Sequence, residues 1–521
     1  MLVDSPIRRV PRSVKWLFFG GLLLLGALVF SDYGTSWDEP VDRQNGLVSL
    51  RYVAELVAPG WAANQAALQQ APPLLDYYDN DHGVLFELPL ALLDVLRPGT
   101  DPRPYYLLRH AAVFLVSLGG VWALFRLGAL RFRDERLGLL AAGLFVLSPR
   151  FFGESFYNGK DLVFVAAFTL GCYTLAWLLE RPSGRRALVH GLATAAAVDI
   201  RILGLLLVPF TFTLLGWQFW STAEPRARRA RRQAALVYGP ALAVFVVIGW
   251  PYLWAHPIRH LQGAFLSMSH YSWDASVLYW GQMIPAKDLP WHYPLVWISI
   301  TTPVAYQVAA LLGLGVVTAT LLRQPWAALR TTAGQLDLLV AGWLVVPLGL
   351  VIFFHSTIYD GWRHLYFIYP ALLLLAVRGG RAVAQFGQRG TGWRALALSL
   401  GALAGAEAVL TAGRMVAMHP NQQVYFSYLP RRQAEVLFER DYWGLSMRQG
   451  LEYLVAHQPK GRLHVYVDHT VLFDNNKVWL SPADQARLVL GEDSVRGRYF
   501  LADYRSVAGD YPAARRGVVA G

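Results

Sequence analysis

Cysteine and charged residues are scarce in this chain, and each shortage excludes a class of protein. The 521 residues include one cysteine, Cys172, which excludes an internal disulfide and any cysteine-rich metal site. Charged residues make up 16% of the chain, against roughly 25% in an average soluble domain. We find no convincing glycine-rich loop for a nucleotide phosphate. The chain is therefore too apolar for an ordinary soluble protein, and it carries no sign of nucleotide chemistry.

Long apolar runs fill most of the sequence instead. Hydrophobic residues account for 55% of the chain and the mean hydropathy is +0.33. The first run follows a basic amino end, and no small-residue cleavage site comes after it, so we expect it to be a retained span rather than a signal peptide. Runs of this length predict an all-α polytopic membrane protein with about eleven spans. The expected spans cover residues 16–30, 106–129, 137–149, 161–179, 187–199, 202–219, 234–250, 297–321, 336–354, 365–377 and 395–411.

Basic residues fall in every second connection between these runs. Because cytoplasmic loops are enriched in lysine and arginine, this alternation predicts a cytoplasmic amino end and a carboxyl end outside. It also explains the net charge of +12 without a nucleic-acid partner. The clusters lie at residues 8–15, 131–136, 181–186, 226–232, 323–330 and 378–394.

Two long outer loops and a polar carboxyl-terminal part complete the predicted organisation. Loop 31–105 contains an apolar stretch, 84–96, that is too short to cross a bilayer, so we expect an interfacial helix there. The second long outer loop is 251–296. We expect residues 1–411 to form the membrane module. Residues 412–521 are expected to form a small outer domain of mixed α/β type, in which the alternation at 462–467 predicts a strand.

The clearest candidate site is the acidic pair Asp38-Glu39, directly after the first span. Charges at a membrane boundary are costly unless they are paired or used, which makes them functional candidates. Adjacent acids on an extended segment point in different directions, so one can face a substrate while the other holds a metal or the backbone. The alternative is a solvated turn that carries an acidic pair.

A second candidate is Asn158-Gly159-Lys160-Asp161, in a short outer turn. Lys160 could neutralise a lipid phosphate as a compact point charge, while Asp161 orients it or holds a metal. A local ion pair at the start of the next helix is an equally good explanation, because Asp161 is favourable near a helix amino end.

Two further outer segments place arginine beside aspartate. In residues 359–364 the guanidinium of Arg363 could grip a phosphate in a bidentate manner, or it could pair with Asp360 or snorkel to the interface. Arg201 offers the same choice, and we expect it to pair locally with Asp199. Tyr359 and His364 lie close to Arg363 in the sequence.

Histidines in the outer loops give only weak metal signals. The segment Asp79-Asn80-Asp81-His82 contains ligand-type residues, but its spacing matches no tight metal template. His292 stands among tryptophan, tyrosine and proline, a setting more typical of an interfacial aromatic belt. We keep His82, Glu87 and His292 as candidate cavity residues.

These motifs, in this order, resemble the membrane glycosyltransferases of the GT-C class. The nearest branch looks like the bacterial relatives of protein O-mannosyltransferases and of the lipid A aminoarabinose transferase. The resemblance implies that Asp38 is the catalytic acid and Asp161 an acidic residue of the second outer loop. The chain lacks the Lys-Pro-Pro of aminoarabinose transferases near Glu87, so their donor and acceptor are not carried over. The matching segments are 38–39, 82–89, 148–149, 160–161, 289–294, 363–364, 419–426 and 441–443.

The resemblance implies an inverting glycosyltransferase of a bacterial inner membrane that uses a polyprenyl-phosphate sugar at the outer face. A phosphate is a good leaving group and needs cations rather than a general acid, while the acceptor hydroxyl needs one base. The acceptor would be a protein, lipid or polysaccharide, and no cofactor is certain beyond a possible divalent metal. Alternatives are another transferase that uses a diphosphate donor, or a lipid or glycan transporter. The expected roles are base and support for Asp38 and Glu39; phosphate binding for Lys160, Arg201, Arg363 and His364; cavity lining for His82, Glu87, Asn158, Asp161, His292, Tyr359 and Asp360; and metal binding for Asp38, Glu39 or Asp161.

Overall fold

A computed structural model describes residues 6–97, 99, 101–269, 273–491 and 499–509 of the chain. Within these residues, nine helices are long and apolar enough to cross a membrane. The chain is therefore an all-α polytopic membrane protein, as its apolar runs predicted. These helices are α1 (Arg12–Val29), α6 (Arg103–Phe132), α9 (Asp161–Glu180), η2 with α11 (Ile202–Leu206 and Leu207–Ser221), α12 (Pro225–Gly249), α15 (Val304–Arg323), α17 (Thr332–Phe353), η5 with α18 (Arg363–Ile368 and Tyr369–Phe386) and α19 (Thr391–Ala417).

Three of the eleven expected spans differ from the structure. The run at 137–149 ends as α7 (Glu135–Val146), and the chain then turns by 74° into α8 (Pro149–Tyr157). The run at 187–199 forms α10 (Gly184–Val198), whose 15 residues fall short of a full crossing. The run at 297–321 is divided into α14 (Tyr293–Thr301) and α15.

Proline accounts for two of these breaks. Pro149 and Pro303 each lack a backbone N–H, and proline also disfavours helix geometry in the residue before it. Counting α7 and α8 as one bent span raises the number of candidate crossings in the described part of the chain to ten. The expected eleven spans would require α10 as well.

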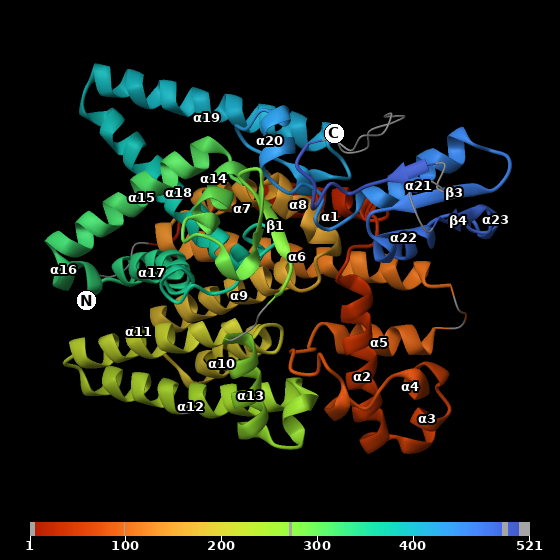
Figure 1. Ribbon diagram of the computed structural model, residues 1–521. Coiled ribbons are helices and arrows are strands. Elements are labelled where there is room, and N and C mark those ends of the chain that lie inside the picture. Colours follow the sequence, from red (N-terminus) through yellow and green to blue (C-terminus); the bar gives the residue numbers. More distant parts are fainter. Residues whose placement is uncertain (1–5, 98, 100, 270–272, 492–498, 510–521) are drawn as a thin grey trace.

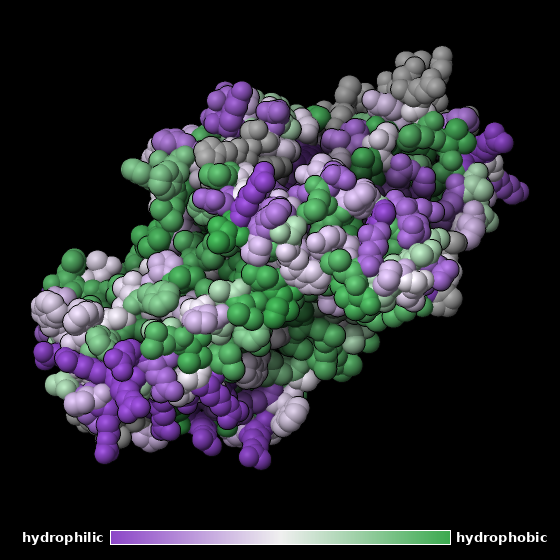
Figure 2. Space-filling view, turned by 90° about the horizontal axis from the view of Figure 1, so that it is seen from below, coloured by the Kyte–Doolittle hydropathy of each residue, from purple (hydrophilic) through white to green (hydrophobic). Residues whose placement is uncertain are grey.

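The loops that carry basic clusters meet at one end of the helix bundle. The backbone N–H of Arg8 donates to the carbonyl of Arg133 at 2.9 Å. The indole of Trp217 donates to the carbonyl of Leu329 at 2.8 Å, at the end of α16 (Pro325–Leu329). Figure 1 shows α16 and the α11–α12 turn together at the left. Figure 2 shows hydrophilic side chains at that end, next to a broad hydrophobic surface. The assignment of this end to the cytoplasm stays a prediction.

The first long loop folds at the opposite end of the bundle, at the right of Figure 1. Its helices share a core that includes Val48, Leu68 and Leu74. The predicted short helix at 84–96 is confirmed as α5, which is too short to cross a bilayer. The loop contains α2 (Glu39–Val57), α3 (Pro59–Ala63), α4 (Ala66–Gln70), η1 (Leu74–Asp76) and α5 (Glu87–Leu96).

The second long loop combines short helices with a hairpin. Its strands β1 and β2 pair antiparallel, with Ser276 opposite Pro285. The loop contains η3 (Pro251–Trp254), α13 (Pro257–Ser269), β1 (Ser276–Tyr279), β2 (Gln282–Pro285) and η4 (Ala286–Asp288). The connection between α18 and α19 is η6 (Gly387–Arg389).

The carboxyl-terminal part is a small α/β unit beside the first long loop (Figure 1). Its described strands form a parallel sheet in the order β4-β3-β5, and Leu451, Val465 and Phe473 belong to its own core. The strand predicted at 462–467 is confirmed as β3. The elements are η7 (Gln422–Val424), α20 (Arg431–Leu437), α21 (Ser446–His457), β3 (Leu463–Val467), α22 (Thr470–Lys477), α23 (Pro482–Gln485), β4 (Leu488–Leu490) and β5 (Tyr499–Leu501).

Candidate active site

Asp38 meets Arg363 at the end of the bundle opposite the basic loops. Asp38 lies between α1 and α2, and Arg363 begins η5, 325 residues further along the chain. The guanidinium Nη1 of Arg363 donates to the carboxylate of Asp38 at 2.8 Å. The side chain of Asp38 is 35% exposed and that of Arg363 is 7% exposed. An accessible carboxylate is therefore held by a buried cation.

Asp161 links this pair to the other predicted cation. Its carboxylate lies 3.7 Å from Nη1 of Arg363 and also forms an ion pair with Arg201. Asn158 orients it: the Asn158 amide donates to the Asp161 carboxylate at 3.1 Å and accepts the Asp161 backbone N–H at 2.8 Å. The fold thus brings together motifs that lie far apart in the sequence.

The expected pair between Arg201 and Asp199 is wrong. Arg201 turns to Asp161, and Asp199 is buried without an ion pair among the described residues. The reason is local geometry: α10 ends at Val198, and Asp199 packs against the backbone of Gly83 and Gly249.

The remaining residues of segment 359–364 surround the same arginine. Asp360 lies 3.4 Å from Nη2 of Arg363. The ring of Tyr359 faces the guanidinium at 5.1 Å and stacks on Trp273 at 4.3 Å. The His364 ring contacts Tyr359 edge-on at 4.7 Å. Aromatic faces and carboxylates together fix the position of Arg363.

The pKa of Asp38 and the pKa of Asp360 are shifted in opposite directions. Burial tends to raise the pKa of Asp38, but the charges of Arg363, Lys160 and Arg201 outweigh burial and hold it below the ordinary 3.8. For Asp360, burial outweighs the neighbouring arginines and the pKa is raised. Asp38 is therefore ionised at neutral pH, which a general base requires.

Lys160 differs from the other cations of the site in its ion pairing. Within the part of the chain that the structure describes, its ammonium makes no ion pair or hydrogen bond, whereas Arg201 and Arg363 are both paired with carboxylates. Its charge still lowers the pKa of Asp38. It opens onto a narrow pocket lined by Asp42, Asn45, His82, Gly83, Phe86, Glu87, Gly159 and Ile200.

A second charge cluster surrounds Arg109 on α6. Arg109 forms an ion pair with Glu87, lies 2.7 Å from Asp42, and lies 3.8 Å from Glu39. The Nε2 atom of His110 lies 2.9 Å from the Glu39 carboxylate. The side chain of Arg109 is fully buried and that of Glu39 is 1% exposed. Burial, together with the charge of Glu87, raises the pKa of Asp42 to about 7.

Glu39 therefore faces a different set of neighbours from Asp38, although the two are adjacent in sequence. Its second carboxylate oxygen accepts the backbone N–H of Ser36 at 2.7 Å. This contact closes the turn in which Asp38 lies, which gives Glu39 a supporting position.

Among the residues that the structure describes, two groups of side chains could hold a divalent cation. Asp79, Asp81 and His82 form the first, with His82 Nδ1 at 3.1 Å and 3.2 Å from the two carboxylates. Asp468, His469 and Asp503 form the second, in the carboxyl-terminal part. Among the described residues, no group of three ligands within 4.8 Å of one another includes Asp38, Glu39 or Asp161.

His292 does not join the cluster. Its Nδ1 lies 2.7 Å from the hydroxyl of Tyr279 in the β1–β2 hairpin, and its ring contacts Trp291. Tyr293, the next residue, does reach the site region, because its hydroxyl accepts the backbone N–H of Gly361 at 3.1 Å.

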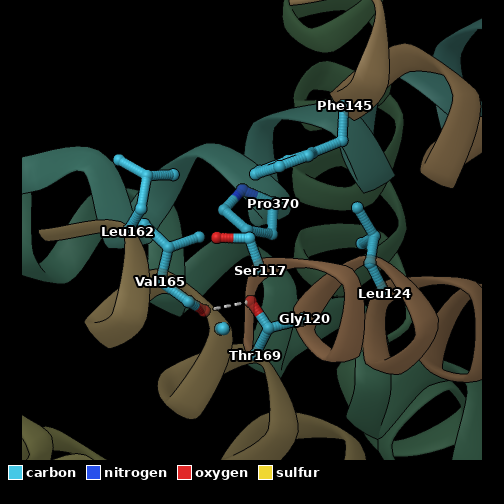
Figure 3. A pocket seen from close by; sticks show the side chains of 9 residues that line it. Ser117, Gly120, Leu124, Phe145, Leu162, Val165, Thr169 and Pro370 are labelled. Atoms are coloured by element: carbon cyan, nitrogen blue, oxygen red, sulfur yellow. Dashed lines mark hydrogen bonds between the residues drawn. The ribbon is translucent and has the colours of Figure 1, made fainter. Parts of the chain in front are cut away.

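A further small pocket lies within the helix bundle (Figure 3). Ser117 and Thr169 provide its side-chain hydroxyls, and that of Thr169 donates to the Val165 carbonyl of its own helix at 2.6 Å. It has no ionisable lining residue, so it does not provide charge chemistry. The lining comes from α6, α7, α9 and α18: Ser117, Gly120, Leu124, Phe145, Leu162, Val165, Ala166, Thr169 and Pro370.

Sequence reasoning missed several residues of these clusters. Arg109 and His110 had a usable signal, because a charge inside an apolar run marks a buried polar network. Asp42 lies three residues after Glu39 and would share its face of a helix. Glu439 accepts the Gly361 N–H at 2.8 Å, and Arg505 donates to Asp360 at 2.6 Å. Both lie in a polar region where ionisable residues are common, so nothing in the sequence singled them out.

No family model matches the chain, and no curated protein sequence matches it either. Among solved structures, the fold is similar to that of ArnT from Cupriavidus metallidurans in the apo state, with 13% sequence identity and a TM-score of 0.46. The alignment covers 86% of this chain and 72% of that chain. The helices and the ion pairs together describe a multi-pass helical membrane protein with a cluster of charged side chains at one end.

Proposed function

We propose that this protein is an inverting glycosyltransferase that uses a polyprenyl-phosphate sugar at the outer face of a bacterial inner membrane. The observation that carries the proposal is the accessible carboxylate of Asp38, 2.8 Å from Arg363 in a cluster of cations. The motifs that resemble GT-C transferases include both residues. The basic loops favour a cytoplasmic amino end, and we therefore assign the cluster to the outer side.

In the proposed reaction, an acceptor hydroxyl attacks the anomeric carbon of the sugar. A carbon–oxygen bond to the acceptor forms while the bond to the donor phosphate breaks. The hydroxyl proton passes to Asp38, and polyprenyl phosphate leaves with an added negative charge. Attack from the side opposite the leaving phosphate inverts the anomeric centre. One base and a set of cations suffice, because phosphate needs no general acid.

Arg363 can couple donor binding to the strength of the base. While it is paired with Arg363, Asp38 has a lowered pKa and is a weak base. A donor phosphate that draws the guanidinium toward itself would weaken this pair and raise the pKa of Asp38. Lys160 adds a cation that no carboxylate neutralises among the described residues, and we assign it to the phosphate with Arg201 and Arg363.

The remaining candidates take surrounding roles. We assign Glu39 to support of the Asp38 turn, and Asn158 and Asp161 to orientation of the arginines. His82, Glu87, Tyr359, Asp360 and His364 line the space around them. A metal requirement would be met by the Asp79, Asp81 and His82 group, whose ligand atoms lie within 4.8 Å of one another.

A transfer assay with purified protein in lipid nanodiscs tests the proposal. Radiolabelled polyprenyl-phosphate hexoses and pentoses are offered with a membrane extract as the source of acceptor. We expect transfer by the natural chain and a loss of roughly 10²–10⁴-fold in Asp38→Asn, the range of general base catalysis. Asp101→Asn is the matched control, because Asp101 is an exposed acid of the same loop that pairs with Arg103 at 2.7 Å. Full transfer by Asp38→Asn would refute the mechanism.

A further inference from the structure

The segment that carries Asp38 is held by the carboxyl-terminal part of the chain. The backbone N–H of Thr35 donates to the side-chain oxygen of Asn476 at 2.9 Å, and the Asn476 amide donates back to the Thr35 carbonyl at 2.9 Å. The indole of Trp479 donates to the Thr35 hydroxyl at 3.0 Å. Arg448 donates to two carbonyls further back in the same segment, both at 2.7 Å. Side chains from α21, from α22 and from just beyond α22 therefore fix the backbone that leads into Asp38.

Arg505 reaches the other half of the cluster. It follows β5, where its backbone N–H donates to Asp503 at 3.0 Å. Its guanidinium donates to the carboxylate of Asp360 at 2.6 Å. It also lies 5.6 Å from the ring of Trp37 and 5.5 Å from that of Trp273. One partly buried arginine thus contacts the residue before Asp38 and a carboxylate beside Arg363.

The loop that delivers Arg363 has strained backbone. Asp360 has a φ of 55° and Gly361 a φ of 69°, in the left-handed region. For a residue other than glycine this conformation costs on the order of 1–3 kcal/mol and persists only when neighbours impose it. The neighbours here are Arg505 on the Asp360 side chain and Glu439, which accepts the Gly361 N–H at 2.8 Å. Both lie in the carboxyl-terminal part.

We propose that Asn476 and Arg505 are positioning residues of the transfer reaction, so that the carboxyl-terminal part completes the active site. Asn476 fixes the backbone before Asp38. Arg505 binds one oxygen of Asp360 at 2.6 Å, while the other oxygen lies 3.4 Å from Arg363, so that Asp360 is shared and Arg363 keeps its shorter contact with Asp38. The proposal rests on the proposed transferase function, in which neither residue touches the reacting atoms.

Kinetics of the full-length protein in nanodiscs test the role of Arg505. We expect Arg505→Met to lower kcat by roughly 100-fold, the cost of a misplacement near 1 Å, with a much smaller change in KM for the donor. Arg505→Lys keeps the charge beside Asp360 and should recover most of the rate. Arg487→Ala is the control, because Arg487 pairs with Asp484 at 3.0 Å within the same part of the chain. We expect that variant to match the natural chain.

Asn476→Asp is the companion variant, since it keeps an oxygen for the Thr35 N–H but loses the amide that donates to the Thr35 carbonyl. Hydrogen–deuterium exchange then supplies a readout that needs no substrate. We expect Arg505→Met to speed exchange in residues 359–363, and Asn476→Asp to speed it in residues 31–38, with each effect local.

The outcomes separate the two proposals. If the natural chain transfers sugar and Arg505→Met keeps its kcat, the positioning role is overturned while the transferase function stands. A natural chain that transfers no sugar overturns the proposed function, and the positioning role falls with it if exchange at 359–363 and 31–38 is also unchanged in the variants. A third outcome also overturns the positioning role. In that outcome Arg505→Met loses rate, Arg505→Lys does not restore the rate, and exchange is faster throughout residues 440–491, which would show general unfolding of the carboxyl-terminal part.

Discussion

Arg363 and Arg109 each stand among three carboxylates, yet their surroundings differ. The neighbours of Arg109 are Glu39, Asp42 and Glu87, and all of these side chains are less than 10% exposed. The neighbours of Arg363 are Asp38, Asp161 and Asp360, of which Asp38 is 35% exposed. The same residue types therefore build one cluster that is buried, with Asp42 and Glu87 at the edge of a narrow pocket, and one whose Asp38 is accessible.

The two clusters also differ in the sign of their charge. Among the described residues, Arg109 is the only arginine that pairs with Glu39, Asp42 and Glu87, so the acids outnumber the arginine. Burial, together with the charge of Glu87, raises the pKa of Asp42 to about 7. Around Arg363, Asp161 also pairs with Arg201, and Asp360 also pairs with Arg505. Lys160 adds a further positive charge nearby. An excess of positive charge stabilises a phosphate leaving group. The buried Arg109 cluster instead connects α2, α5 and α6 through ion pairs.

Position in the sequence does not decide which cluster an acidic side chain enters. Asp38 and Glu39 are neighbours, but their side chains enter different clusters, because α2 begins at Glu39 and turns the two carboxylates apart.

The largest effect, on the free energy of unfolding, is expected when the buried cluster loses Arg109. Arg109→Met leaves three buried carboxylates without their arginine, and removal of one partner from a buried pair typically costs about 3–5 kcal/mol. Unfolding can be followed with a thiol-reactive dye, since Cys172 is buried in α9. The control is Arg103→Met on the same helix, an exposed pair worth about 0–1 kcal/mol. Equal melting temperatures for the two variants would contradict a structural role for the Arg109 cluster.

A smaller effect is expected on phosphate binding when Lys160 is replaced. Lys160→Met should weaken the binding of polyprenyl phosphate by roughly 10–100-fold, since a hydrogen bond to a charged group contributes about 1.5–3 kcal/mol. Titration with the short-chain isoprenyl phosphate in nanodiscs measures this affinity. Lys287→Met, at an exposed lysine of the second outer loop, is the matched control. Unchanged affinity in Lys160→Met would show that the excess charge does not serve the phosphate.

The smallest effect is a change in how stability depends on pH. Asp42 has a folded pKa of about 7 against an ordinary 3.8, so between these values the folded state binds the proton more tightly. The free energy of unfolding therefore falls as pH rises through this window. Asn does not titrate, so the melting temperature of Asp42→Asn relative to the natural chain should rise by a few degrees from pH 5 to pH 8. A difference that stays constant with pH would contradict the raised pKa.

Much of the architecture follows from sequence patterns with a simple physical basis. Apolar runs predicted the helices because a bilayer satisfies no backbone hydrogen bonds, and the alternation at 462–467 predicted β3. The predictions failed where the run at 297–321 was taken as continuous through Pro303, and where the run at 137–149 was taken as a whole span although the chain turns into α8 at Pro149. The motifs around Asp38, Lys160 and Arg363 were recognisable because charges at the edge of an apolar run are conspicuous.

The sequence by itself therefore determined the class of the protein, its helices and the residue types available at one end of the bundle. Only the tertiary structure decided the partners: Arg201 with Asp161 rather than Asp199, Glu39 with Arg109 rather than beside Asp38, and Arg505 with Asp360. Periodicity and hydropathy act over a few turns of chain, whereas an ion pair depends on distances of a few ångströms between segments hundreds of residues apart. Those distances are set by packing, which no local pattern records.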